Sequence, residues 1–134
     1  MYRLTNKEIS DLIHTAFSIR KLSYSPYSKF AVGSALLCDD GEIYGGCNIE
    51  NSSYSATVCA ERVALFKAIS NGERGFEAIA IVCEKGDFCY PCGVCRQVMS
   101  EFCDESFRII LEGDNIIKSH TLEELLPHSF KLKD

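Results

Sequence analysis

Three cysteines stand at three-residue intervals in the stretch CYPCGVCRQ, residues 89 to 97. Two of them form Cys92-Gly93-Val94-Cys95 at the start of a predicted helix. A turn that enters a helix lets residues three apart face the same point, so the two sulfurs can reach one metal ion. Packing thiols and a redox pair are the alternatives, but a redox pair is expected in an N-terminal thioredoxin-like unit, and this one lies late in the chain.

The stretch TVCAER, residues 57 to 62, brings cysteine, glutamate and arginine together at the start of another predicted helix. Taken alone, Cys59 would be a buried helix residue, and Glu61 with Arg62 would be a solvated ion pair. The later C-x-x-C reverses that interpretation. Free N–H groups and a partial positive charge at helix starts favour thiolates, so two such starts could share one zinc ion.

Three thiolates and Zn²⁺ together carry one net negative charge, which weakens the acidification of a bound water; Arg62 is the nearby cation that offsets it. Three protein ligands also leave the fourth position to water, which is typical of catalytic zinc. Glu61 is then well placed to carry protons. The alternative is a structural zinc module with four thiolate ligands, closed by Cys89, which has no water and no use for Glu61.

The elements that must position these residues follow from hydrophobic periodicity and turn signals. Thr5-Asn6-Lys7-Glu8 predicts a capping box, and Asp39-Asp40-Gly41 between two apolar runs predicts a hairpin. Four helices are predicted: one that ends at about residue 22, one over 58–70, one that begins at 92, and a short one from 121 to Pro127. Four strands are predicted, over 30–38, 42–48, 77–83 and 107–111. Their order makes the later strands parallel and gives a mixed sheet covered by helices.

Length and charge limit the class of protein. A chain of 134 residues is long enough for one compact domain and too short for two. A net charge of −5 argues against a nucleic-acid partner and favours a small, weakly charged ligand. No leader and no run of ~18 apolar residues is found, which predicts a cytoplasmic protein with no membrane partner and cysteines kept as thiols.

Four stretches together resemble the cytidine deaminase family, in its free-nucleoside branch with a three-cysteine zinc site. They are CAER (59–62), PCGVCRQ (91–97), YSPYSKFAVGSAL (24–36) and NIENSSY (48–54), so the resemblance covers roughly residues 24 to 102. It implies an α/β fold, a three-layer α-β-α arrangement with a mixed five-stranded sheet, and one catalytic domain over residues 1–134. It further implies hydrolysis of cytidine, and of 2′-deoxycytidine, to the uracil nucleoside and ammonia in pyrimidine salvage.

The resemblance also assigns the metal and the proton carrier. Cys59, Cys92 and Cys95 would bind one Zn²⁺ per subunit, and zinc-activated water would attack C4 of the pyrimidine. Glu61 would move protons from that water to ring N3 and to the departing ammonia. Cys89 is then the cysteine left over.

Substrate-binding and supporting roles follow with it. Asn48 and Glu50 lie two apart at a strand end and point to one side, which suits a ribose; an ordinary polar loop is the alternative. Phe30 would contact the pyrimidine ring rather than only the core, and Ala60 would contact the substrate. Phe130 would complete a neighbouring subunit's site, which implies a homotetramer. Arg62 would support the ligands from behind, and Gln97 would support the helix end.

Two other deaminases remain as alternatives. A deaminase of a cytosine-containing antibiotic such as blasticidin S shares the zinc motif but lacks the need for a ribose-binding pair. A polynucleotide deaminase conflicts with the acidic charge. The sequence does not distinguish cytidine from deoxycytidine as the preferred substrate.

Overall fold

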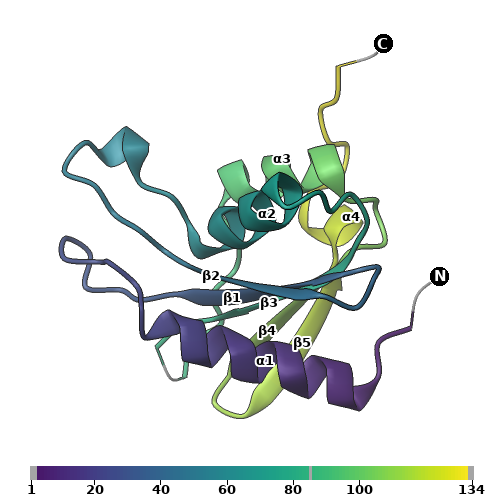
Figure 1. Cartoon of the computed structure of the whole chain (residues 1–134), viewed down its shortest axis with the longest axis horizontal. Helices are drawn as coiled ribbons and strands as arrows, with labels where there is room; N and C mark the ends of the chain where they lie inside the picture. The colour runs from purple at the N-terminus through teal and green to yellow at the C-terminus, as the bar shows by residue number, and fades with distance from the viewer. Residues whose placement is uncertain (1–2, 85, 133–134) are drawn as a thin grey trace.

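The computed structural model of the chain describes residues 3–84 and 86–132. It contains a five-stranded sheet with helices on both faces (Figure 1). The strands are β1 (Gly33–Cys38), β2 (Ile43–Cys47), β3 (Phe76–Val82), β4 (Arg108–Gly113) and β5 (Ile116–Thr121). The helices are α1 (Asn6–Arg20), α2 (Ala60–Ser70), α3 (Gly93–Phe102) and α4 (Leu122–Leu125), with a short 3-10 helix η1 (Tyr54–Ala56).

The sheet has the order β2-β1-β3-β4-β5 and both strand directions. β3 and β4 run parallel and are joined through α3, whereas β1 pairs antiparallel with β2 and β3, and β5 pairs antiparallel with β4. α1 lies against one face, and α2, α3 and α4 lie against the other (Figure 1). The predicted three-layer arrangement with a mixed five-stranded sheet is confirmed.

β5 is the element that the residue pattern does not predict, because four of the six residues in IIKSHT are polar and they do not alternate with apolar ones. Its hairpin with β4 turns at Asp114 and Asn115, which have φ of 56° and 64°. Left-handed conformation at both central residues is the geometry of a tight two-residue hairpin, and Asp and Asn tolerate it well. β5 forms one edge of the sheet, and four of its six residues are exposed.

α1 begins with the predicted capping box. The Thr5 hydroxyl accepts a hydrogen bond from the Glu8 N–H at 3.1 Å, and the Glu8 carboxylate accepts one from the Thr5 N–H at 3.0 Å. The helix packs against β1 at Gly33, where a Cβ atom would stand 2.0 Å from the Ala16 carbonyl oxygen. No helix within the described ranges is long and apolar enough to cross a membrane.

Apolar side chains on both faces of β3 fix the middle of the sheet. Ile79 and Ile81 join the core under α2 and α3, while Ala78, Ala80 and Val82 join the core under α1. Burying a side chain such as Ile contributes about 1.5–3 kcal/mol relative to leaving it exposed. This packing fixes the positions of α2 and α3 on the sheet, and with them the first turns of both helices.

Two long segments, residues 23–32 and 48–58, project from the sheet beside the start of α2 (Figure 1). Single β-bridges join Tyr24 to Ile49 and Ile49 to Val58. These bridges tie both segments to the residues that lead directly into α2.

Candidate active site

Two helix starts bring the three cysteines of the sequence motifs together. Cys59 is the N-cap of α2, Cys92 is the N-cap of α3, and Cys95 lies in the first turn of α3. The Cys92 sulfur accepts a hydrogen bond from the Cys95 N–H at 3.5 Å and lies 3.7 Å from the Cys59 sulfur. All three sulfurs lie within 4.8 Å of one another.

These spacings fit a zinc ion. Zinc bound by thiolates at about 2.3 Å in a tetrahedral site places its sulfur ligands about 3.8 Å apart. Cys89 does not belong to the group of sulfurs that lie this close. The three cysteines therefore suit a zinc ion, which would have a fourth coordination position for another ligand.

One thiol of the sulfur cluster, that of Cys59, is acidified even before a metal is considered. A hydrogen bond with the Cys95 thiol lowers the pKa of Cys59 to about 5, with help from Arg62 and against the opposing effect of burial. The same hydrogen bond, in which Cys95 keeps its proton, raises the pKa of the Cys95 thiol. A cation in the cluster would take the place of the proton on Cys95.

Arg62 is the cation nearest to these sulfurs. Its Nη2 donates a hydrogen bond to the Cys59 sulfur at 3.5 Å. Although burial opposes it, hydrogen bonding to Cys59 and Cys95 raises the pKa of the guanidinium. Its Nε is a buried donor with no hydrogen-bond partner among the described residues. Arg62 thus lies beside the Cys59 sulfur, where its charge can offset that of a thiolate.

Glu61 is a buried acid beside the cluster. It lies in the first turn of α2, and only 5% of its surface is exposed. Burial raises the pKa of its carboxyl to about 7, and the negative charge of Cys59 acts in the same direction. A group with such a pKa can both accept and donate a proton near neutral pH.

A pocket of about 270 Å³ contains Glu61 and two of the sulfurs. It brings together seven of the residues to which the resemblance assigns a role in the site. The lining residues are Ser28, Phe30, Val32, Asn48, Glu50, Thr57, Val58, Cys59, Ala60, Glu61, Cys89, Tyr90 and Cys92. A neighbouring hollow of about 350 Å³ shares Ser28, Glu50 and Thr57 with it, so the two adjoin at Glu50.

Asn48 and Glu50 do face the same pocket, but both also hold the 23–32 segment. The Asn48 Oδ1 accepts hydrogen bonds from the Val32 N–H at 2.9 Å and the Ser23 hydroxyl at 2.5 Å, and its Nδ2 donates to the Phe30 carbonyl at 2.8 Å. One amide hydrogen of Asn48 is left for a ligand.

The Glu50 carboxylate accepts hydrogen bonds from the N–H groups of Tyr27 and Ser28 at 2.9 and 3.1 Å, and from the Ser28 hydroxyl. The bond from the Ser28 hydroxyl, with help from the two N–H groups, lowers the pKa of Glu50. A carboxylate has about four acceptor sites, so capacity for a ligand hydroxyl remains.

Phe130 and Gln97 lie outside this pocket. The Gln97 Nε2 donates a hydrogen bond to the Phe130 carbonyl at 3.0 Å, and 66% of the Phe130 surface is exposed. Gln97 thus contacts the C-terminal segment rather than the sulfur cluster. The Phe130 ring is exposed enough to contact another molecule.

Six of the pocket residues have no assigned role in the preferred interpretation of the sequence, and Cys89 and Tyr90 are the two among them that lie directly before the metal ligands of α3. Burial, and then the neighbouring Cys83 and Glu61, raise the pKa of Cys89 to about 12, so this thiol stays neutral. Tyr90 lines the same wall and is 41% exposed. Its position directly before Pro91-Cys92 was the available signal, since any side chain there must lie near the metal ligands.

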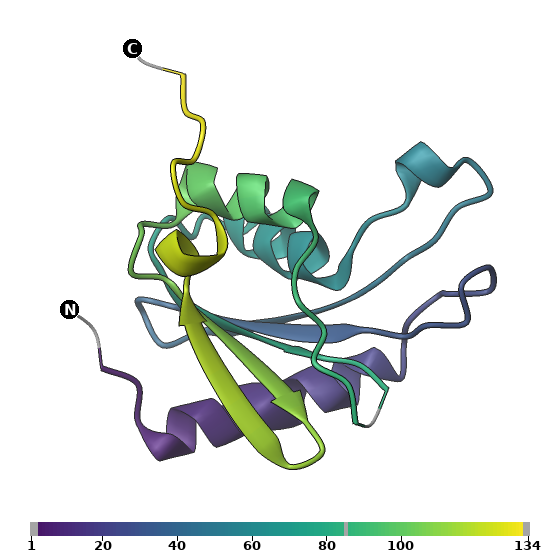
Figure 2. The ribbon, with the colours of Figure 1, turned by 180° about the vertical axis from the view of Figure 1, so that it is seen from behind.

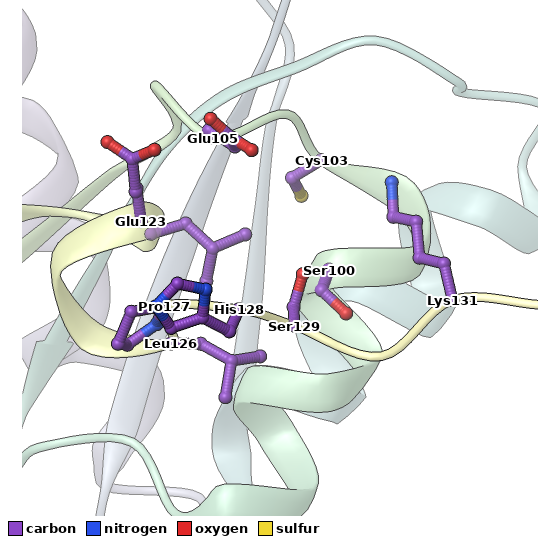
Figure 3. Close-up of a pocket in the computed structure, with 10 residues that line it drawn as sticks. Ser100, Cys103, Glu105, Glu123, Leu126, Pro127, His128, Ser129 and Lys131 are labelled. Atoms are coloured by element: carbon purple, nitrogen blue, oxygen red, sulfur yellow. The ribbon is translucent and has the colours of Figure 1, made fainter.

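A larger cavity of about 570 Å³ lies between α3, α4 and the C-terminal segment (Figure 3). Figure 3 shows Glu105 and Glu123 at one side, Lys131 at the other, and the single thiol of Cys103 between them. One thiol beside separated charges lacks the ligand set that the first pocket has. The chemistry of the motifs therefore belongs to the smaller pocket.

Three cysteine sulfurs at the spacing of zinc ligands, next to a buried acid in a small pocket on an α/β sheet, are typical of a zinc-dependent hydrolytic enzyme. Comparison with known proteins agrees. The family model described as the cytidine and deoxycytidylate deaminase zinc-binding region matches residues 6–111.

Relatives and solved structures point the same way. A cytidine deaminase of Sporosarcina psychrophila is 49% identical over 130 residues, covering 95% of this chain and 94% of that protein. The crystal structure of a cytidine deaminase from Burkholderia pseudomallei is 41% identical, with a TM-score of 0.88, and covers 95% of this chain and 100% of that one. A blasticidin-S deaminase of Bacillus cereus is 34% identical over 108 residues, 75% of this chain and 76% of that protein.

The chain belongs to the cytidine and deoxycytidylate deaminase family. It is accordingly a zinc-binding hydrolytic deaminase, as the sequence motifs predict.

Proposed function

We propose that this protein deaminates cytidine, and also 2′-deoxycytidine, by hydrolysis. The observation that carries the proposal is the buried Glu61 carboxyl in the same 270 Å³ pocket as the Cys59 and Cys92 sulfurs. A pocket of that size accepts a small heterocycle with its sugar at the open side and leaves no room for a folded polynucleotide. The relatives named as cytidine deaminases support this substrate class.

The chemistry divides between the metal and Glu61. A zinc ion held by Cys59, Cys92 and Cys95 would acidify a water molecule and supply the nucleophile for attack on C4 of the pyrimidine. Glu61 accepts a proton from that water and passes it to ring N3. It then carries the second proton to the amino group, which leaves as ammonia. The water oxygen becomes the C4 carbonyl, so cytidine and water give uridine and ammonia.

Four residues bind the nucleoside in this proposal. The Phe30 ring contacts the pyrimidine, and so does Ala60, which lines the same pocket. Asn48 and Glu50 bind the ribose hydroxyls with the donor and acceptor capacity that their internal hydrogen bonds leave free. Arg62 offsets the charge of the thiolates, and Gln97 holds the segment that carries Phe130.

We further propose that residues 1–134 form one catalytic domain that binds one zinc ion. Four such subunits would form a homotetramer in which Phe130 contacts the active site of a neighbour. The exposed Phe130 ring supports the shared site. Eight free cysteines support a reducing, cytoplasmic location and a role in pyrimidine salvage. A nucleic-acid or membrane partner is not part of this proposal, in keeping with the net charge of −5.

The test is to measure the zinc content of the purified protein and to follow the loss of absorbance of cytidine, deoxycytidine, CMP and blasticidin S. We expect one zinc per chain and turnover of the two nucleosides well above that of the other compounds. Bound zinc without turnover of any cytosine compound would support a structural zinc module instead. Preferred turnover of blasticidin S would favour the antibiotic deaminase.

A further inference from the structure

The segment between β3 and α3 lies beside the edge strand β5 (Figure 2). This segment ends at Cys92, one of the three cysteines of the sulfur cluster. Two side-chain contacts join the segment to β5. The Lys118 Nζ stands 4.2 Å from the centre of the Phe88 ring. The Tyr90 hydroxyl lies 3.2 Å from the His120 Nε2, with the two rings 5.4 Å apart and tilted by 51°. Lys118 and His120 are two apart and therefore point to the same face of β5.

The two contacts differ in one respect. Tyr90 lines the pocket that contains Glu61 and Cys59, whereas Phe88, Lys118 and His120 do not. Tyr90 and Phe30 are the two aromatic side chains among the residues that line it. Tyr90 therefore touches both the edge strand and the space where a nucleoside would bind.

An aromatic ring in this place suits a planar heterocycle. Aromatic faces bind bases through stacking and apolar contact, which contributes about 1–3 kcal/mol per base in single-strand binders. Tyr90 is 41% exposed, so its ring would be free to turn unless something held it. The contact with His120 holds the hydroxyl at one end, and a side chain fixed before binding loses less entropy when the ligand arrives.

We propose that Tyr90 is a substrate-binding residue whose ring forms the pocket wall beside Cys92 and contacts the nucleoside, and that His120 is the positioning residue that holds this ring. The proposal rests on the proposed nucleoside deamination. It assigns β5 a part in substrate recognition, although β5 contributes no residue to the pocket itself.

The competing explanation is that both contacts only hold the segment in place. Lys118→Ala is the matched control, because it removes the contact to Phe88 from the same strand and the same segment but changes nothing that lines the pocket. Tyr90→Phe keeps the ring and removes only the hydroxyl. Tyr90→Ala removes both, and His120→Ala removes the partner.

The experiment measures kcat, KM, zinc content and the unfolding temperature for the parent and these variants with cytidine. We expect Tyr90→Ala to raise KM about 10-fold, with kcat changed less than about 3-fold and zinc retained. Tyr90→Phe and His120→Ala should each raise KM by only about 2- to 5-fold. The double variant Tyr90→Phe/His120→Ala should have a KM no higher than that of either single variant, because both changes remove the same contact. Lys118→Ala should leave KM unchanged.

An unchanged KM in Tyr90→Ala would overturn the proposal, and so would an equal rise in KM in Lys118→Ala or a loss of zinc in Tyr90→Ala. Calorimetric titration with uridine keeps this result separate from the proposed function. If the parent protein turns over no cytosine nucleoside, the proposed function fails. Weaker uridine binding in Tyr90→Ala than in Lys118→Ala would still establish the Tyr90 contact, and equal binding would refute it.

Discussion

Burial of the Glu61 carboxyl both raises its pKa and places it in the pocket beside the sulfurs. Burial disfavours the charged form, and the thiolate of Cys59 nearby acts in the same direction, so the pKa rises to about 7. The same burial places the carboxyl in the wall of the pocket, next to the sulfurs rather than in solvent. An exposed glutamate on the outer face of α2 would have neither the proton affinity nor the contact.

Replacement of Glu61 by Gln tests its role as the proton carrier. Gln is close in size and accepts hydrogen bonds but carries no transferable proton, so the fold and the zinc content should be kept. General acid–base catalysis contributes about 10²–10⁴-fold per transfer, and two transfers pass through this group, so kcat should fall by at least about 10³-fold. Steady-state assays with metal analysis check this. Activity within about 10-fold of the parent would remove Glu61 from the mechanism.

If three thiolates bind the zinc, the loss of Cys92 and the loss of Cys89 should affect the zinc content differently. Cys92→Ala should lose stoichiometric zinc, because its sulfur lies 3.7 Å from that of Cys59 and has no substitute. Cys89→Ala should keep one zinc per chain, because Cys89 lies outside the cluster. Both proteins are to be compared by metal analysis after dialysis. Loss of zinc from the Cys89 variant would revive the structural site with four thiolates.

At the scale of elements, the site depends on how closely α2 approaches the sheet. Gly46 of β2 lies under the start of the helix, and a Cβ atom there would stand 2.3 Å from the Ala60 carbonyl oxygen and 2.5 Å from the Ala64 nitrogen. The Ser34 hydroxyl, from the neighbouring strand, donates a hydrogen bond to the same carbonyl at 2.8 Å. These contacts fix the first turn of α2, which carries Glu61.

Gly46→Ala should therefore displace the first turn of α2. Overpacking of this kind costs about 1–3 kcal/mol in the free energy of unfolding, and zinc affinity should fall with it because Cys59 moves with the helix. Gly45→Ala is the control, since its Cβ would meet Ile19 at an ordinary 3.4 Å. Denaturant unfolding and zinc titration of both variants check the prediction. Equal zinc affinity in the two would show that α2 does not need this close approach.

We expect the stability of the 23–32 segment to depend on the charge of Glu50. Hydrogen bonds from Ser28 and from the N–H of Tyr27 lower its pKa below the usual value near 4.5. A depressed carboxyl pKa gives stability that is present above the unfolded pKa and is lost as the pH falls through the folded pKa. Glu50→Gln should therefore flatten the acid side of the stability curve below about pH 4.5.

The control for this prediction is Glu101→Gln, because the Glu101 carboxylate accepts no hydrogen bond from the described residues. Unfolding free energies measured from pH 3 to pH 7 decide the matter. If the Glu50 and Glu101 variants lose stability in parallel with the parent at low pH, the charge of Glu50 does not hold the segment.

What could be predicted from the sequence differs between these elements for physical reasons. The helix starts at Cys59 and Cys92 were predictable because capping and periodicity are local. β5 was not found in the residue pattern, because an edge strand with polar residues has weak alternation, although Asp114-Asn115 was a usable turn signal. The contact between Tyr90 and His120 was beyond reach, since it joins residues 30 apart whose approach depends on the whole sheet.

For the whole molecule, three large exposed aromatic side chains occur in two places: Tyr27 and Tyr54 in the hollow beside the pocket, with ring centres 6.4 Å apart, and Phe130 on the C-terminal segment beside α3. Tyr27 is 50% exposed, Tyr54 78% and Phe130 66%. Large apolar side chains that cluster on one surface are typical of a protein interface. The proposed tetramer would cover both places at once, because the exposed Phe130 of one chain would meet the pocket region of its neighbour.

The prediction for the assembly is complementation between two inactive variants. Four copies of the 15.0 kDa chain should give a particle of about 60 kDa by light scattering. Glu61→Gln removes the proton carrier, and Phe130→Ala removes the ring that we propose enters a neighbour's site. In a mixed tetramer, some sites combine an intact Glu61 from one chain with an intact Phe130 from another, so activity should return.

Recovery distinguishes the two possible positions of Phe130. If Phe130 served only its own chain, every site with Glu61 would still lack the ring, and mixing would restore nothing. Mixing the Phe130→Ala protein with a Glu61→Gln/Phe130→Ala double variant is the control, because no chain in it has the ring. Activity measured before and after subunit exchange gives the answer, and a fully active 15.0 kDa monomer would contradict the shared site altogether.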